Sequence, residues 1–227
     1  MSKKKVIVFA PHPDDETWGC GGTIAKKISE GYEVLVVVMT DGRYAFLYML
    51  GIDLDPTPEE LKEIRKEEVK RATKILGVPE ENLIFLDFVD GTLENEEEKV
   101  EERVTEILRK NRPVEVYLPY KNDAHPDHRA AYRIVTNSIR KLGISAAAYQ
   151  YSILHKYARV GPIIDTLLNF FKRNVVHVDV SKFIPLKTAA AKEFKSELKT
   201  ISPRQQNPIT NSVKKFLKSK EMFYIDK

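Results

Sequence analysis

The chain has 227 residues, of which 42% are hydrophobic and 31% charged, and its formal net charge is +4. This length and composition are typical of one globular domain, which we expect to span residues 1–227. Lysine and arginine are spread along the sequence and form no basic stripe, so we expect no nucleic-acid partner. No apolar run approaches the ~20 residues of a membrane helix, and the start is too short for a signal peptide. A cytoplasmic protein without a membrane partner is expected.

Short apolar runs alternate with helical patterns along the chain. Strands are predicted at residues 5–10, 33–39, 83–86, 114–118, 149–154 and 174–180. Helices are predicted at residues 22–30, 57–76, 94–110, 129–142 and 186–198. This alternation predicts right-handed βαβ units, and therefore an α/β fold with a doubly wound, Rossmann-like, mostly parallel sheet covered by helices on both faces. Residues 44–56 and 202–212 have no regular pattern and are candidates for substrate flaps.

The tripeptide His-Pro-Asp occurs twice, each time just after a predicted strand. His12-Pro13-Asp14 follows the strand at 5–10, and His125-Pro126-Asp127 follows the strand at 114–118. In open α/β sheets, ligands bind outside the carboxyl ends of the strands. We therefore expect the two segments to meet at one edge of the sheet.

The residue types in these segments are those of a catalytic metal site. Three protein ligands and one open position describe catalytic zinc, and the only cysteine, Cys20, excludes a cysteine-based zinc site. Of the adjacent carboxylates Asp14 and Asp15, one can bind the ion while the other acts as general base towards a water molecule. If a helix begins near Pro126, one of the two nearby histidines can reach the ion and the other the substrate. The pattern predicts metal-assisted hydrolysis.

Four segments resemble one known family, the PIG-L/LmbE-like zinc-dependent de-N-acetylases. The matching segments are residues 10–23, 40–42, 65–68 and 122–129. The resemblance implies a hydrolase that removes the N-acetyl group from an N-acetylglucosamine-type sugar, free, short and chitin-derived, or glycosidic, and releases acetate and an amino sugar. It also implies one Zn²⁺ per chain, held by His12, Asp15 and His128, and a homo-oligomer.

The same resemblance implies roles for further residues. Asp14 would be the general base, and His125 would stabilise the oxyanion and protonate the leaving amine. Asp127 would orient His125, and Arg65 would bind the substrate. Three more residues near the predicted site are candidates for substrate contact, namely Asp41, Arg43 and Tyr120.

Two other functions fit parts of the pattern. An Fe(II) enzyme uses the same set of two histidines and one carboxylate. The second carboxylate beside the ligand favours hydrolysis, which requires a base. A non-catalytic nucleotide- or partner-binding module would use the same fold. Gly19, Gly21 and Gly22 lack the dinucleotide-binding spacing, and no Lys-Ser/Thr pair follows them.

Overall fold

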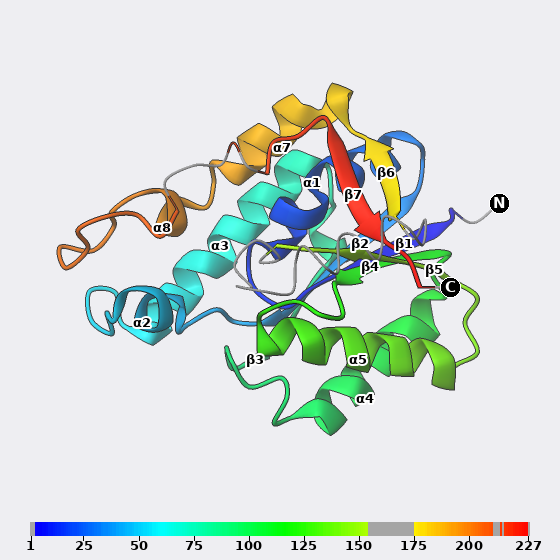
Figure 1. Ribbon diagram of the computed structural model, residues 1–227, viewed down its shortest axis with the longest axis horizontal. Coiled ribbons are helices and arrows are strands. Elements are labelled where there is room, and N and C mark those ends of the chain that lie inside the picture. The colour runs from blue at the N-terminus through cyan, green and yellow to red at the C-terminus, as the bar shows by residue number, and fades with distance from the viewer. Residues whose placement is uncertain (1–2, 154–174, 211–213, 215, 227) are drawn as a thin grey trace.

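In the computed structural model, residues 3–153, 175–210, 214 and 216–226 are described (Figure 1). They include one seven-stranded sheet with the strand order β3-β2-β1-β4-β5-β7-β6. Strands β1 to β5 pair in parallel, and β7 runs antiparallel to both of its neighbours. The strands are β1 (Lys5–Ala10), β2 (Glu33–Thr40), β3 (Leu83–Phe88), β4 (Glu115–Pro119), β5 (Ala147–Tyr151), β6 (Val175–Asp179) and β7 (Lys220–Tyr224).

Helices cover both faces of this sheet, as the sequence predicted. They are α1 (Asp15–Ser29), α2 (Ala45–Leu50), α3 (Pro58–Leu76), α4 (Glu97–Asn111), α5 (Pro126–Lys141), α7 (Ile184–Ala191) and α8 (Lys195–Leu198). Two short 3₁₀ turns lie at Glu80–Asn82 and Ser181–Phe183. In Figure 1, α1, α3 and α7 lie above the sheet, and α4 and α5 lie below it.

Alternating side chains of the central strands build one core on each face. Val6 and Val8 of β1 pack into the core beneath α1, α3 and α7. Ile7 and Phe9 point the opposite way, into the core formed with α4 and α5. A strand buried on both faces reads as a continuous apolar run, which explains why β1 and β2 were recognisable from sequence. The predicted doubly wound fold is confirmed.

The outer part of the sheet differs from the prediction. Strand β7 was not predicted, because Glu221 interrupts its apolar pattern, yet this carboxylate is buried. The strands predicted at 149–154 and 174–180 correspond to β5 and β6, and their residues 154 and 174 lie outside the described part of the chain. The helix predicted at 186–198 is divided into α7 and α8.

Helix α1 begins seven residues earlier than predicted, at Asp15 instead of residue 22. Two glycines of this helix allow it to approach its neighbours closely. A Cβ atom on Gly19 would lie 2.6 Å from the Tyr151 ring, and one on Gly22 would lie 2.7 Å from Val180. Packing therefore outweighs the low helix propensity of glycine here.

The segment at 44–56, predicted to be irregular, contains α2. This short helix buries Phe46 and ends at Gly51, which has φ 69°. Leu47, Tyr48 and Met49 remain exposed on it. All six residues of α2 are apolar, so the sequence shows no alternation of apolar and polar residues that would indicate a helix. By contrast, the helix predicted at 57–76 corresponds to α3, and Thr57 and Glu60 form a capping box at its start.

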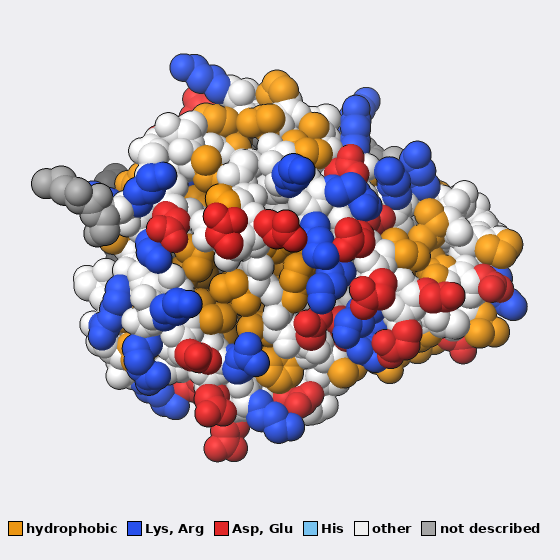
Figure 2. Space-filling view, turned by 180° about the vertical axis from the view of Figure 1, so that it is seen from behind, with side chains coloured by type: hydrophobic (Ala, Val, Ile, Leu, Met, Phe, Trp, Pro, Cys, Tyr) orange, Lys and Arg blue, Asp and Glu red, His pale blue; other side chains and the backbone are white. Residues whose placement is uncertain are grey.

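Two further features concern the surface charges and the lengths of the helices. Figure 2 shows acidic and basic side chains interspersed on the face that it displays. Within the described ranges, no helix is both long and apolar enough to cross a membrane.

A buried ion pair between Lys187 of α7 and Glu221 of β7 holds both elements against α1. The Lys187 ammonium donates to the Glu221 carboxylate at 2.5 Å and to the backbone carbonyl of Trp18 at 3.0 Å. The same carboxylate accepts hydrogen bonds from the backbone of Gly22 and Thr23. These hydrogen bonds, together with the attraction between the two charges, offset the cost of removing the ammonium and the carboxylate from water.

We expect Lys187→Met to lower the free energy of unfolding by about 3 kcal/mol, because it leaves a buried carboxylate without its cation. Lys220→Met, at an exposed position of the same strand β7, is the matched control and should be close to neutral. Denaturant unfolding of both variants measures the difference. Equal stabilities would show that the buried pair contributes nothing net.

Candidate metal centre

The two His-Pro-Asp segments meet because β1 and β4 are adjacent parallel strands. Val6 pairs with Glu115 and Val8 with Tyr117, so both strands end at the same edge of the sheet. The first segment leads into α1 and the second into α5, which begins at Pro126. This start of α5 places residue 128 in the first helical turn, facing the loop that follows β1.

Three donor atoms from these segments form a nearly equilateral triangle. Nδ1 of His12 lies 3.2 Å from Nε2 of His128 and 3.3 Å from Oδ2 of Asp15. The third side, from Nε2 of His128 to Oδ2 of Asp15, is 3.1 Å. Ligands about 2.0–2.1 Å from a tetrahedral zinc ion are separated by roughly 3.3 Å. The spacing of the three atoms therefore fits a small tetrahedral cation.

Carboxylates contact the second nitrogen of both imidazoles. Nε2 of His12 lies 3.1 Å from Oδ2 of Asp127 and 3.4 Å from Oδ1 of Asp90. Nδ1 of His128 lies 3.4 Å from Oδ1 of Asp123. Such carboxylates fix the orientation of metal-binding imidazoles and raise their basicity. The arrangement leaves one nitrogen of each ring for the donor triangle.

The charges around the triangle favour a cation. Burial lowers the pKa of His12, but the hydrogen bonds to Asp127 and Asp15 raise it well above its usual range overall. Burial also lowers the pKa of His128, yet the carboxylates of Asp15 and Asp123 raise it to about 9. The excess of buried carboxylates thus holds protons on both imidazoles, and a divalent cation would satisfy the same negative charge.

His125 caps α5 and stands beside the triangle without belonging to it. Its ring centre lies 4.5 Å from that of His12 and 5.3 Å from that of His128. Nδ1 of His125 accepts a hydrogen bond from the backbone N–H of Asp127, so the proton of the neutral ring is on Nε2. Burial and the positive charges of the other two histidines lower its pKa to about 4.

The carboxylate of Asp127 contacts other groups than those expected from sequence. Its carboxylate was expected to orient the His125 ring, but it contacts His12 and accepts hydrogen bonds from the backbone N–H groups of Gly91 and Leu93. Only its backbone N–H contacts His125. The loop after β3 therefore decides where this carboxylate points.

Asp14 and Arg65 form the other side of the site. Asp14 has φ 137°, a strained conformation for a residue other than glycine. Nη2 of Arg65 donates to Oδ2 of Asp14 at 3.2 Å and to the backbone carbonyl of Pro13 at 2.6 Å. The guanidinium is almost fully buried, with 4% of the residue exposed. The structure thus brings Arg65 to Asp14, where it holds the Pro13–Asp14 peptide in place.

The other predicted substrate contacts are occupied by protein groups. Arg43 forms a two-point contact with Asp41 at 2.7 Å and also pairs with Glu59 of α3. Tyr120 is 1% exposed and packs against Tyr224, with ring centres 4.4 Å apart. These contacts favour roles in supporting the site over direct contact with a substrate.

Three acidic residues of the site were not assigned from sequence. Asp90 and Asp123 contact the two histidines, and Glu197 of α8 lies 3.3 Å from Nη2 of Arg65. Only a general rule could have indicated Asp90 and Asp123 from sequence. A metal-binding imidazole usually donates its second N–H to a carboxylate or a carbonyl group. Asp123 stands two residues before the second motif and was the easiest of the three to find. Glu197 lies far along the chain, in a helix of one turn.

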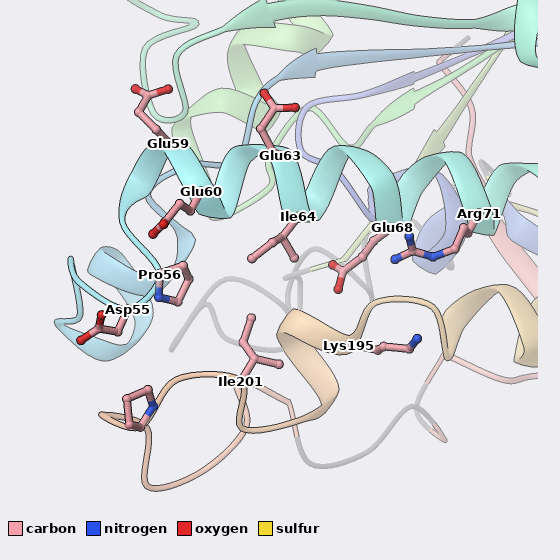
Figure 3. A pocket seen from close by; sticks show the side chains of 11 residues that line it. Asp55, Pro56, Glu59, Glu60, Glu63, Ile64, Glu68, Arg71, Lys195 and Ile201 are labelled. Carbon is pink, nitrogen blue, oxygen red and sulfur yellow. The ribbon is translucent and has the colours of Figure 1, made fainter.

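A groove of about 930 Å³ runs along α3 beside the site (Figure 3). Ile64 of α3 and Ile201 face each other across it, and Glu68 points from α3 into the same space. The two segments predicted to be flaps meet at this groove, where Arg204 pairs with Asp55 at 3.2 Å. Residues 211 and 212 of the second segment lie outside the described residues.

Comparisons with known proteins agree with this site. Residues 7–139 match the model of the PIG-L family, described as GlcNAc-PI de-N-acetylase. The chain is 41% identical over 133 residues to diacetylchitobiose deacetylase of Thermococcus kodakarensis, a match that covers 56% of this chain and 46% of that protein. It is 31% identical over 142 residues to a probable N-acetyl-alpha-D-glucosaminyl L-malate deacetylase 2 of Bacillus cereus, which covers 62% of this chain and 63% of that one. These matches span less than two thirds of both relatives.

A solved structure extends the similarity to nearly the whole chain. N,N'-diacetylchitobiose deacetylase from Pyrococcus horikoshii, complexed with its inhibitor MPG, matches with a TM-score of 0.71 and 26% identity. That match covers 98% of this chain and 84% of the other. Fold and site define an α/β protein with a candidate metal centre at the carboxyl edge of its sheet. More than half of the chain matches the family model, and the protein belongs to the PIG-L family.

We expect Asp127→Asn to weaken metal binding about 10- to 100-fold, because Asp127 holds the His12 ring. Asp179→Asn, at an exposed carboxylate on β6, is the control and should bind metal normally. Titration of the metal-free proteins with Zn²⁺ measures both affinities. If Asp127→Asn bound metal normally but lost turnover, its role would lie with His125, as the sequence suggested.

Proposed function

We propose that this protein is a zinc-dependent hydrolase that removes the N-acetyl group from an N-acetylglucosamine-type sugar and releases acetate and an amino sugar. The observation that carries the proposal is the triangle of His12, Asp15 and His128 with a further carboxylate, Asp14, next to it in the chain. Membership of the PIG-L family and the names of the matched relatives support the reaction class.

The donor set suits one Zn²⁺ ion. Two imidazole nitrogens and one carboxylate oxygen are ligands that zinc accepts, and three protein ligands leave one coordination position open. A zinc ion bound there would polarise the acetamide carbonyl and make a water molecule more acidic. Zinc is therefore the metal that we assign to His12, Asp15 and His128.

Asp14 is the group that we assign as general base. It takes a proton from the attacking water, and the same proton can then pass to the leaving nitrogen as the C–N bond breaks. Arg65 fixes Asp14 through the contacts to its carboxylate and to the carbonyl of Pro13. Arg65 thus acts on the substrate through Asp14, instead of by the direct contact expected from sequence.

His125 is the group that we assign to the developing oxyanion; protonation of the leaving amine, which the family resemblance also implied for His125, is assigned to Asp14. Its Nδ1 is engaged by the backbone of Asp127, so Nε2–H is the donor available to a substrate. The low pKa of the ring favours this neutral donor in the ion-free protein. Asp127 and Asp123 support the site by holding His12 and His128.

The alternatives receive less support. The matched relatives are named as deacetylases, which favours hydrolysis over Fe(II) chemistry and over a nucleotide- or partner-binding module. The identity of the sugar is left to experiment among the classes named by the relatives. A cytoplasmic location and a homo-oligomer stay predictions from sequence.

We expect the zinc-loaded protein to release acetate from at least one compound among N-acetylglucosamine, N,N'-diacetylchitobiose and N-acetylglucosaminyl malate. A chelator should abolish this release. Asp14→Asn should keep the metal but lose about 10²-fold or more in turnover, the size of a general-base contribution. Near-normal turnover by Asp14→Asn would remove Asp14 from the role of base.

The two histidines of the second motif should fail in different ways. His128→Ala removes a corner of the donor triangle, so bound metal should be lost on dialysis. His125→Ala should retain about one zinc ion per chain yet lose most of its turnover. Metal content and acetate release are measured on both variants. Metal retention by His128→Ala would place the ion elsewhere.

A further inference from the structure

Glu16 carries a buried carboxyl group beside Asp14 that the reaction described above does not use. It is the second residue of α1 and is fully buried. Within the described part of the chain its contacts are hydrogen bonds, and no cation pairs with it. Removing a carboxyl group from water without a cation costs stability. Packing alone therefore does not account for a glutamate at this position.

The two oxygens of the Glu16 carboxyl group have different partners. Oε1 accepts a hydrogen bond from the hydroxyl of Thr17 at 2.6 Å. Oε2 accepts one from the backbone N–H of Asp14 at 3.1 Å. The Thr17 hydroxyl thus fixes one oxygen, and the other faces the peptide bond that precedes the proposed base.

The Pro13–Asp14 peptide is held at both of its polar ends. Arg65 of α3 donates to its carbonyl oxygen at 2.6 Å, and Glu16 of α1 accepts from its N–H group. The next carbonyl, that of Asp14, accepts hydrogen bonds from two backbone N–H groups of α1, each at 2.9 Å. A rotation of this peptide would therefore break contacts with both helices.

These contacts hold a backbone conformation that is unfavourable by itself. Asp14 has φ 137° and ψ −29°, outside the regions that residues other than glycine favour. Such a conformation persists only where the surrounding structure holds it. Because the backbone angles set the direction of the Cβ atom, relaxation at Asp14 would also turn its carboxylate.

We propose that Glu16 is a positioning residue for the reaction. By accepting a hydrogen bond from the Asp14 N–H, it keeps the Asp14 carboxylate in the orientation that takes a proton from water. The role requires an acceptor oxygen on residue 16 and no proton transfer by it. This inference rests on the proposed role of Asp14 as base.

Two substitutions of similar length separate a hydrogen-bond acceptor from a space-filling side chain. In Glu16→Gln the amide oxygen can still accept from Asp14, while the amide nitrogen donates to the Thr17 hydroxyl. In Glu16→Met the acceptor is lost. Its kcat should fall about 10- to 100-fold with KM unchanged, because a reacting group misplaced by about 1 Å can cost 10²-fold. Glu16→Gln should retain most of the kcat that Glu16→Met loses.

Bound zinc shows whether the substitution disturbs only Asp14. Asp15, between Asp14 and Glu16, is assigned as a metal ligand, so a general displacement of the start of α1 would release the metal. Glu16→Met should retain about one zinc ion per chain after dialysis. The matched control is Glu30→Met, at an exposed residue just after α1, which should change neither kcat nor bound zinc.

A double-mutant cycle tests whether Glu16 acts through Asp14. The residual turnover of Asp14→Asn is compared with that of Asp14→Asn combined with Glu16→Met. If Glu16 serves to place the Asp14 carboxylate, its replacement should cost little further once that carboxylate is gone. Should Glu16→Met fail to fold, Glu16→Asp takes its place, because its carboxylate is too short to reach the Asp14 N–H.

Four results would overturn the inference: normal kcat in Glu16→Met, equal losses in Glu16→Met and Glu16→Gln, loss of zinc in Glu16→Met, or the same loss of kcat with and without the Asp14 carboxylate. In the replacement variant Glu16→Asp, a normal kcat would do the same. Failure of the proposed function is distinct from these results. Normal turnover by Asp14→Asn alone would reject Asp14 as base, whatever the Glu16 variants show.

Discussion

The parallel pairing of β1 with β4 is the constraint on which the whole site depends. It brings the ends of two strands, more than 100 residues apart in sequence, to one edge of the sheet. The donor triangle takes one corner from the loop after β1, one from the first residue of α1 and one from the first turn of α5. A shift of this register by one residue would reverse which side chains face each core and would separate the corners. The packing of both cores therefore fixes the metal centre as well as the fold.

Carboxylates are more numerous at this site than three metal ligands require. Asp90, Asp123 and Asp127 surround the two imidazoles, and Asp14 stands on the side of Arg65. Backbone N–H groups of Gly91 and Leu93 satisfy the remaining oxygens of Asp127. A cation bound among these groups would lower the cost of burying them, and metal binding would then be coupled to the stability of this edge of the sheet.

The sequence predicted the parts of the site that follow directly from strand ends. His12, Asp15 and His128 converge as expected, because each lies within a few residues of β1 or α5. The partner of the Asp127 carboxylate was not predictable, since the backbone of the β3–α4 loop determines its direction. The buried contacts of Glu197 and Glu221 were not predictable for a related reason. Each is a charged residue in a short element whose burial depends on partners far along the chain, Arg65 and Lys187.

The place of β7 in the sheet has a consequence for the growing polypeptide. This strand lies between β5 and β6, although it follows both in the sequence. During synthesis β6 has no neighbour until residues 220–224 emerge, and α1 lacks the carboxylate of Glu221 that its backbone binds. The helix that carries Asp15 thus receives its last anchor late, after both motifs have been made.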